Sequence, residues 1–319
     1  MRRKYSYLGL ALTLSAFGAG ASGYHLLTRI AVPGQGTWDY VIVDSAAHRV
    51  YLSHETQVQV LDADTKQVVG TIPNTSGAHG IALVPESGHG FISAGLADAV
   101  VIFDLKTFKV VGTVKTEKKP DCILYDAASQ RVFAMNGESD SATVINPRDG
   151  KVEKIIQLGG GPEFSISDGR GNIFVNLKDK NQLARIDSKT MTVKDHWPLA
   201  PCGAPASLGF DAANRRLFVG CRSKLMAVVD ADNGRVVATY AIGDHVDASI
   251  FDPDSKLIFN STGEGNVAVF HQDTVDKYTL IETIPTNLGS KTMGLDLKTH
   301  QLFIPAKVSD AFTVLVYGR

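Results

Sequence analysis

The feature that most constrains this chain is a phrase of about 40 residues that it repeats, most clearly at 207–237. In that copy the apolar runs Leu217–Cys221 and Met226–Asp230 alternate with turns at Asp211–Arg216 and Asn233–Gly234. Short apolar runs separated by Asp, Asn and Gly indicate consecutive strands joined by tight hairpins. None of these runs has the length or the spacing of a buried helix.

The phrase occurs seven times in register. A turn residue after the first strand recurs in steps of 41 to 44 residues, at Asp44, Pro85, Asp126, Asp168, Asp211, Asp252 and Asp296. An aromatic residue at the start of the second strand keeps the same period, at Tyr51, Phe91, Phe133, Phe174, Phe218, Phe259 and Phe303. A period of about 40 residues with four strands per unit is typical of a β-propeller blade. The sequence therefore predicts an all-β fold, a seven-bladed β-propeller with four antiparallel strands per blade.

A second turn, between the third and fourth strands, supports the same frame. It recurs at Asp62–Thr65, Asp104–Thr107, Asn146–Asp149, Asp187–Thr190 and Asp230–Asn233. Asp and Asn suit such corners because their side chains accept a hydrogen bond from the backbone amide two residues on. We assign the recurrent acidic turn residues after the first strand to structure and not to function: Asp44, Asp126, Asp168, Asp211, Asp252 and Asp296.

The two ends of the repeat region complement each other. Residues 24–35 look like a fourth strand without a blade, whereas the last copy stops after its third strand, Phe312–Tyr317. We expect the N-terminal strand to complete the seventh blade, because closing the ring removes an exposed sheet edge.

The repeat resembles that of the YVTN-repeat (YncE-like) seven-bladed β-propeller family over residues 38–319. That family is named for a Tyr-Val-Thr-Asn string on the second strand, and this chain keeps the frame but not the letters. The corresponding strings are Tyr51-Leu-Ser-His54, Phe133-Ala-Met-Asn136, Phe174-Val-Asn-Leu177 and Phe218-Val-Gly-Cys221. The resemblance implies a WD40-like propeller, but propellers host lactonases, oxidoreductases and pure binding modules on one scaffold.

Residues 1–21 have the pattern of a secretory signal peptide. Arg2, Arg3 and Lys4 form a basic head, Leu8–Phe17 is apolar, and Ala19–Ala21 supplies small residues for cleavage. The alternatives are an uncleaved anchor and, given the paired arginines, twin-arginine export. We expect residues 22–319 to form a single propeller domain that is periplasmic or secreted.

The charge balance does not predict a nucleic-acid partner. The formal net charge is −1, and loss of the three cations at positions 2–4 brings it to about −4, without the basic stripe that phosphate binding needs. We expect a monomer without a transmembrane span after cleavage, because no later segment approaches the roughly 20 apolar residues that a span requires.

Candidate ligand-binding residues lie where the loops of one propeller face converge on the central channel. Loops leading into the first strand of each blade carry Asp39, His79, Asp121, Glu163, Pro205, Asp247 and Thr292. Loops between the second and third strands carry His54, Asn136, Asn176, Arg222, Asn260 and Lys307. We expect these two sets to form a polar mouth, with Trp38 beside it.

The acidic residues of this mouth suit a divalent cation such as Ca²⁺, which takes oxygen ligands. Asp121, Glu163 and Asp247 are the candidate ligands, and His79 or His54 would favour a transition metal instead. The alternative is that the carboxylates cap backbone amides and neutralise Lys119, Lys291 or Arg222, with no metal bound.

Two hypotheses of function follow. The first is an exported protein that recognises a small ligand or a protein partner at the mouth without catalysis. The alternative is a metal-dependent lactonase, in which a metal polarises the lactone carbonyl and His79 or Glu163 acts as base. Cys202 and Cys221 are a candidate disulfide, since hairpin pairing brings both to one face, and Cys122 is expected to be a buried apolar residue.

Overall fold

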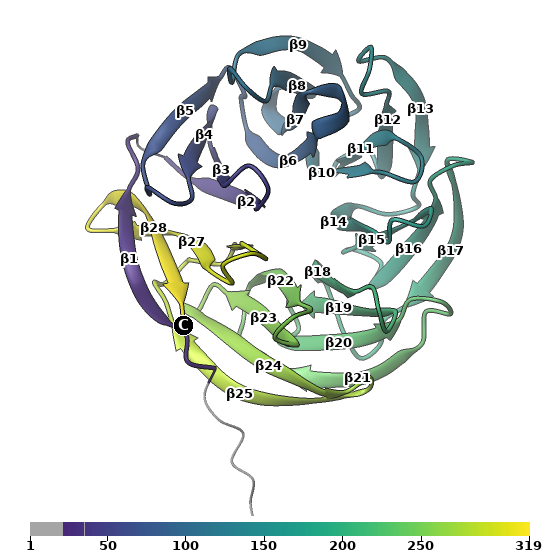
Figure 1. The fold of residues 1–319 in the computed structure, drawn as a ribbon. Helices are drawn as coiled ribbons and strands as arrows, with labels where there is room; N and C mark the ends of the chain where they lie inside the picture. Colours follow the sequence, from purple (N-terminus) through teal and green to yellow (C-terminus); the bar gives the residue numbers. More distant parts are fainter. Residues whose placement is uncertain (1–21, 35) are drawn as a thin grey trace, which may run out of the picture.

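A computed structural model describes residues 22–34 and 36–319. Seven four-stranded antiparallel sheets stand in a ring around a central channel (Figure 1). The predicted seven-bladed β-propeller is therefore confirmed. The expected signal peptide, 1–21, lies outside the described residues.

Six blades are each built from four consecutive strands, numbered from the channel outwards. Blade 1 holds β2 (Trp38–Asp44), β3 (Arg49–His54), β4 (Gln57–Asp62) and β5 (Val68–Pro73). Blade 2 holds β6 (Ala78–Val84), β7 (His89–Ala94), β8 (Ala99–Asp104) and β9 (Val110–Lys115), with 3₁₀ turns η1 (Pro85–Ser87) and η2 (Gly95–Ala97). Blade 3 holds β10 (Pro120–Asp126), β11 (Arg131–Asn136), β12 (Ser141–Ile145) and β13 (Val152–Gln157). Blade 4 holds β14 (Pro162–Ser167), β15 (Asn172–Leu177), β16 (Gln182–Asp187) and β17 (Thr192–Pro198).

The remaining blades continue the series until the chain ends meet. Blade 5 holds β18 (Pro205–Asp211), β19 (Arg216–Cys221), β20 (Leu225–Asp230) and β21 (Val236–Ala241). Blade 6 holds β22 (Val246–Asp252), β23 (Leu257–Thr262), β24 (Asn266–Thr274) and β25 (Lys277–Pro285). Blade 7 holds β26 (Gly294–Leu295), β27 (Leu302–Val308), β28 (Ala311–Gly318) and the N-terminal β1 (His25–Ala31).

The ring closes between the two ends of the chain. Strand β1 pairs antiparallel with β28, with Arg29 opposite Leu315 and Ile30 opposite Val314 (Figure 1). Ile30 is buried in a cluster that joins blade 7 to blade 1. The expected completion of the last blade by the N-terminal strand is confirmed, and it removes a free edge from β28.

The repeated aromatic residues form the packing between blades. All seven are 2% exposed or less: Tyr51, Phe91, Phe133, Phe174, Phe218, Phe259 and Phe303. Each lies on the second strand of its blade, where alternate side chains face the neighbouring sheet. Their period in the sequence is thus the period of the core.

The recurrent acidic turns are structural, as their repetition indicated. Asp44 Oδ1 accepts hydrogen bonds from the backbone amides of Ala46 and Ala47, at 3.1 and 2.9 Å. Asp62 Oδ1 does the same for Asp64 and Thr65, at 3.0 and 2.8 Å. These side chains supply acceptors that the backbone of a tight corner lacks.

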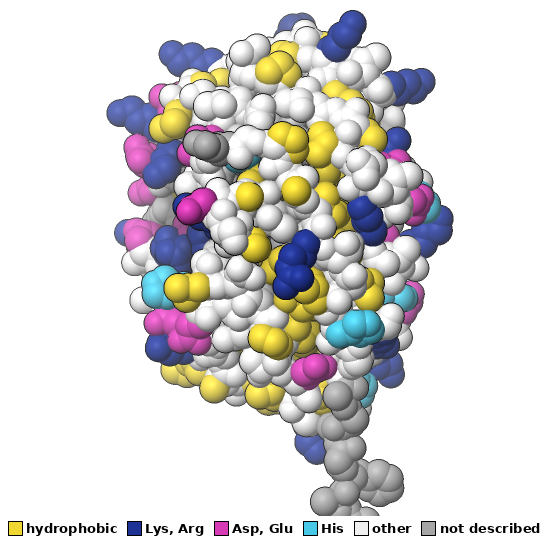
Figure 2. All heavy atoms as spheres, turned by 90° about the vertical axis from the view of Figure 1, so that its left-hand side faces the viewer, with side chains coloured by type: hydrophobic (Ala, Val, Ile, Leu, Met, Phe, Trp, Pro, Cys, Tyr) yellow, Lys and Arg dark blue, Asp and Glu magenta, His cyan; other side chains and the backbone are white. Residues whose placement is uncertain are grey.

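The surface carries both positively and negatively charged side chains. On the side of the ring that Figure 2 faces, Lys and Arg side chains are scattered among Asp and Glu instead of forming one stripe. Among the described residues, no helix has the length and apolar character needed to cross a bilayer.

Candidate ligand-binding site at the channel mouth

The innermost strands share an irregularity at the end where they begin. In six blades the pairing between the first and second strands shifts near this end, as β-bulges do. The first unpaired residues at these shifts are Asp39, His79, Asp121, Glu163, Ala206 and Asp247. A bulge re-aims the side chain that it carries, so five of the predicted mouth residues occupy equivalent irregular positions around one ring. We call this end of the channel the mouth.

Three of these side chains meet in a cluster that we call the acidic arc: Asp39, His79 and Asp121. The Nδ1 atom of His79 lies 2.5 Å from Asp39 Oδ2 and 3.8 Å from Asp121 Oδ1. Each side chain is about a quarter exposed, at 26%, 22% and 23% for His79, Asp39 and Asp121.

Proton binding to the acidic arc is favoured by its surroundings. Burial alone would lower the pKa of His79, but the hydrogen bond to Asp39 and the charge of Asp121 outweigh it and raise that pKa. Burial and the nearby charge of Asp39 raise the pKa of Asp121 to about 7, although His79 opposes this shift. The arc therefore holds protons more firmly than the same groups would in water.

The other side of the mouth is a chain of ion pairs that we call the basic chain: Lys178, Glu163, Arg222, Asp247 and Lys291. Glu163 Oε1 accepts from Lys178 Nζ at 2.9 Å and from an Arg222 guanidinium nitrogen at 3.1 Å. The same Arg222 nitrogen donates to Asp247 Oδ1 at 3.1 Å, and Lys291 Nζ pairs with Asp247 Oδ2.

Arg222 compensates for a gap in the ring. Blade 5 presents Ala206 where other blades present a polar side chain, and Arg222 reaches in from the loop after β19. It bridges the carboxylates of blades 4 and 6, Glu163 and Asp247. The sequence left open that Arg222 and Lys291 neutralise mouth carboxylates. The structure shows these ion pairs.

Two aromatic rings cross the channel directly below the mouth. Tyr40 of blade 1 stacks on Phe164 of blade 4, with ring centroids 5.6 Å apart, and its hydroxyl donates to the Glu163 carbonyl at 3.4 Å. Burial raises the pKa of Tyr40 well above its usual value, so the hydroxyl stays protonated. Beneath lies an apolar cavity of about 510 Å³ that includes Leu83, Phe210 and the buried Cys122. Tyr40 and Phe164 therefore separate the polar mouth from the apolar cavity of the channel.

A cavity opens at the mouth, and we call it the mouth pocket. It has a volume of about 710 Å³ and lies between blades 7, 1 and 2. Its polar lining includes Asp39, His79, Glu55 and Lys291, and its apolar lining includes Trp38 and Leu96. The indole of Trp38 stacks on Phe312 at 5.4 Å, which holds it in place, whereas Leu96 is 81% exposed.

A smaller cavity, which we call the side pocket, opens between blades 3 and 4. It has a volume of about 400 Å³. Its charged lining consists of Lys119, Asp121, Glu163, Lys178 and Asp179. This pocket has no aromatic or large aliphatic wall, so it differs in character from the mouth pocket.

The three predicted asparagines do not reach the mouth. Asn136, Asn176 and Asn260 are fully buried, inside strands instead of in loops. Asn136 donates to Ser141 and Thr143, both at 3.0 Å. Alternation along the strand directs these amides into the sheet packing, so they brace blades and cannot contact a ligand at the mouth.

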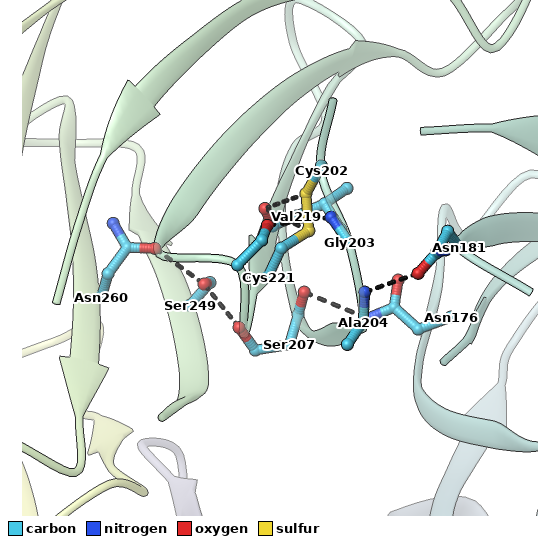
Figure 3. Close-up of a disulfide and its surroundings, with 11 residues drawn as sticks. Asn176, Asn181, Cys202, Gly203, Ala204, Ser207, Val219, Cys221, Ser249 and Asn260 are labelled. Atoms are coloured by element: carbon cyan, nitrogen blue, oxygen red, sulfur yellow. Dashed lines mark hydrogen bonds between the residues drawn. A yellow bond between two sulfur atoms is a disulfide. The ribbon is translucent and has the colours of Figure 1, made fainter. Parts of the chain in front are cut away.

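Asn176 and Asn260 belong to one hydrogen-bond chain, drawn in Figure 3. Asn176 donates to the Ser207 carbonyl at 3.2 Å, and the Ser207 and Ser249 hydroxyls lie 2.7 Å apart. Ser249 donates in turn to Asn260 Oδ1 at 2.8 Å. The chain links β15 of blade 4, β18 of blade 5, and β22 and β23 of blade 6.

Cys202 and Cys221 form a disulfide (Figure 3). It joins the loop that leads into blade 5 to the end of β19, with Cα atoms 5.8 Å apart. Arg222 follows Cys221 directly, so the disulfide anchors the loop from which the guanidinium reaches the ring.

The set of residues that could hold a cation differs from the sequence hypothesis. Of Asp121, Glu163 and Asp247, only Asp121 lies in a metal-capable group, with Asp39 and His79, whose ligand atoms all lie within 4.8 Å of one another. Glu163 and Asp247 are engaged by cations instead.

Four further residues near the mouth differ in how well the sequence predicted them. The expectation that His54 lies in a mouth loop is wrong: it is the last residue of β3 and is buried, with Nδ1 2.8 Å from Gln59 Oε1. Lys307 lies on β27 and pairs with the exposed Asp310. Lys178 and Leu96 were missed. Lys178 follows Leu177 just as Arg222 follows Cys221, which is a signal in the repeat frame. Leu96 lies in the equivalent loop of blade 2, which forms the 3₁₀ turn η2.

Comparisons with known proteins show the fold alone. No family model matches the chain, and no curated protein matches its sequence. Among solved structures it resembles hydrazine synthase of Kuenenia stuttgartiensis, with a TM-score of 0.78 and 15% identity over 92% of this chain and 98% of that one. It also resembles the WD40 repeats of RRP9, with a TM-score of 0.79 and 9% identity over 93% and 98%.

Proposed function

We propose that this protein binds a small ligand at the channel mouth. The observation that carries the proposal is the mouth pocket, about 710 Å³ in volume, which combines Trp38 and Leu96 with convergent charged groups. Ligand sites are typically concave, largely apolar and equipped with a few placed polar groups. An 81% exposed leucine at the rim would lose its contact with water when a ligand covers it.

The geometry supports recognition on a preorganised ring. Asp39 and His79 hold each other, Lys291 is held by Asp247, and Trp38 is held by Phe312. Because these side chains are fixed before a ligand arrives, binding orders few rotamers and loses little entropy. We expect little backbone movement on binding.

A ligand screen tests this proposal. A library of small metabolites is tested for thermal stabilisation of the protein, and hits are measured by titration calorimetry on wild type, Leu96→Ala and Leu280→Ala. Leu280 is a matched control, since it is also exposed but lies on the outer strand β25. We expect a hit whose affinity falls in Leu96→Ala and not in Leu280→Ala. Equal affinity in both variants, or no hit, contradicts the proposal.

We further propose that the chain acts in the periplasm or outside the cell. The support is the signal-like pattern of residues 1–21 and the Cys202–Cys221 disulfide, a bond that persists in oxidising compartments. N-terminal sequencing of the protein from its source is expected to show a start close to Ser22. A start at Met1 with free thiols at both cysteines contradicts this assignment.

The grouping of Asp39, His79 and Asp121 favours a second candidate function, a metal-dependent lactonase. The donor types fit a divalent transition metal, which when bound would polarise a lactone carbonyl. His79 would have to lose its proton first, and the raised pKa of His79 opposes this. Elemental analysis of dialysed protein together with a lactone hydrolysis assay separates the two candidates. Stoichiometric metal with hydrolysis would favour the enzyme.

A further inference from the structure

The charges of the mouth are divided between its two sides. The acidic arc begins and ends in a carboxylate, Asp39 at one end and Asp121 at the other, with the His79 imidazole between them. The basic chain begins and ends in a lysine, so it carries one uncompensated positive charge. Carboxylates therefore lie at both ends of the arc along blades 1–3, and ammonium groups lie at both ends of the basic chain along blades 4–7.

The two sides meet at the two cavities of the mouth. Asp39, at one end of the acidic arc, and Lys291, at one end of the basic chain, both line the mouth pocket. Asp121 and Lys178, the opposite ends, both line the side pocket. Each cavity thus presents a carboxylate and an ammonium group, but only the mouth pocket adds an apolar wall, from Trp38 and Leu96.

The mixed ionisable lining of the mouth pocket supports a dipolar occupant. Its ionisable lining consists of the carboxylates Asp39 and Glu55, the His79 imidazole and the Lys291 ammonium group. One Glu55 oxygen accepts from the Thr37 amide at 3.1 Å, which keeps this carboxylate at the rim. A ligand with a single charge would match only half of this lining and leave the other half desolvated against it.

We propose, building on the proposed function, that the mouth pocket binds a small zwitterion with an apolar body, of the class of free α-amino acids with apolar side chains. The ligand ammonium group faces Asp39 and its carboxylate faces Lys291. The apolar side chain lies between the indole of Trp38 and Leu96, which covers the exposed leucine.

Titration calorimetry with four probes tests each part of this recognition on the full protein. The probes are L-leucine, L-leucinamide, which lacks the carboxylate, N-acetyl-L-leucine, which lacks the ammonium group, and glycine, which lacks the side chain. We expect L-leucine to bind with a Kd below about 1 mM. Each of the other three is expected to bind about tenfold more weakly or worse, since hydrogen bonds to charged groups and buried apolar area each contribute that much.

Two variants test whether Lys291 is responsible for the preference for L-leucine over L-leucinamide. In Lys291→Met, L-leucine and L-leucinamide are expected to bind with equal affinity, because the partner of the carboxylate is gone. Asp247 retains Arg222 as a partner in this variant, so the mouth stays paired. Lys151→Met is the matched control, because Lys151 is 79% exposed and pairs with Asp149 in an outer turn. It is expected to keep the wild-type preference.

The outcomes separate this inference from the proposed function. If L-leucine does not bind, but a library compound binds and loses affinity in Leu96→Ala, then the mouth is a ligand site and the zwitterion assignment is wrong. If L-leucine binds wild type no better than L-leucinamide does, or if Lys291→Met keeps the preference, the assignment is also wrong. Tight binding of L-leucine with loss of preference in Lys291→Met alone supports it.

Discussion

The two ends of the innermost strands obey different rules. At the end away from the mouth, the same solution recurs: an Asp such as Asp44 or Asp211 accepts backbone hydrogen bonds in the turn. At the mouth end, the backbone repeats its irregularity but the side chain changes from blade to blade, from Asp39 to His79 to Ala206. Repetition at one end reports what every blade needs in order to fold. At the mouth end, the backbone irregularity repeats but the side chain does not, so we infer that these side chains serve the function of the assembled ring and not the folding of each blade.

The largest predicted effect concerns the ring that holds both ends in place. A chain that begins at Thr37 lacks β1 and the buried side chains of Ile30 and Val32. We expect it to lose about 5 kcal/mol or more of unfolding free energy, from lost strand pairing and apolar burial. That is comparable to the whole stability of many domains. Urea denaturation measures the loss, and a loss below about 1 kcal/mol would show that β1 is only an appended tail.

The next effect concerns the disulfide beside the mouth. Replacing Cys202 and Cys221 together with Ser is expected to cost about 2–4 kcal/mol, because the bond constrains a short loop of the unfolded chain. It should also loosen the loop that carries Arg222. Unfolding curves of wild type with and without reductant give the same comparison without mutation, and coincident curves would contradict the prediction.

A matched pair of substitutions tests the contrast between the two strand ends directly. Asp211 is 1% exposed, and its Oδ1 accepts from the amides of Ala213 and Asn214, so Asp211→Ala is expected to cost about 2 kcal/mol. Asp121→Asn is expected to leave stability unchanged or to raise it, since burial already disfavours the charge of Asp121. Thermal unfolding of both variants at pH 7 decides the matter. A greater loss in Asp121→Asn would reverse the assignment of structural and functional ends.

The smallest effect is a pH dependence. The pKa values of His79 and Asp121 are both raised in the folded protein, so the folded state binds more protons than the unfolded state. Stability from these groups is therefore present at acidic pH and lost as pH rises through their folded pKa values. Between pH 5 and pH 8, wild type should lose unfolding free energy that the double variant His79→Gln, Asp121→Asn does not lose. Parallel pH profiles of the two proteins would argue against a proton-holding arc.

The sequence sufficed for the fold because one signal was copied seven times. Tyr51 and the six equivalent phenylalanines specify both the period and the core, and a single weak copy would not have been convincing. Closure by residues 24–35 followed from counting strands. The pairing of Cys202 with Cys221 followed from the hairpin between β18 and β19, which fixes which strand ends share a face.

The site was less accessible to sequence reasoning because it depends on geometry across the ring. The register shifts that aim Asp39 and Asp121 leave no mark in the sequence, and neither does the contact between Tyr40 and Phe164, which lie three blades apart. The sequence also did not determine where each strand ends relative to its asparagine. Asn260 was expected in the loop after β23, but it lies inside that strand. Residues of the right type were identified, but their neighbours were not.

Hydrogen exchange with and without the tightest-binding compound of the library tests most directly whether ligands bind at the mouth end of the strands. We predict new protection at 36–39, 77–79, 95–97 and 288–292, and none at the turns 44–48, 126–130 and 211–215. Protection at those turns, with the mouth segments unchanged, would contradict the account.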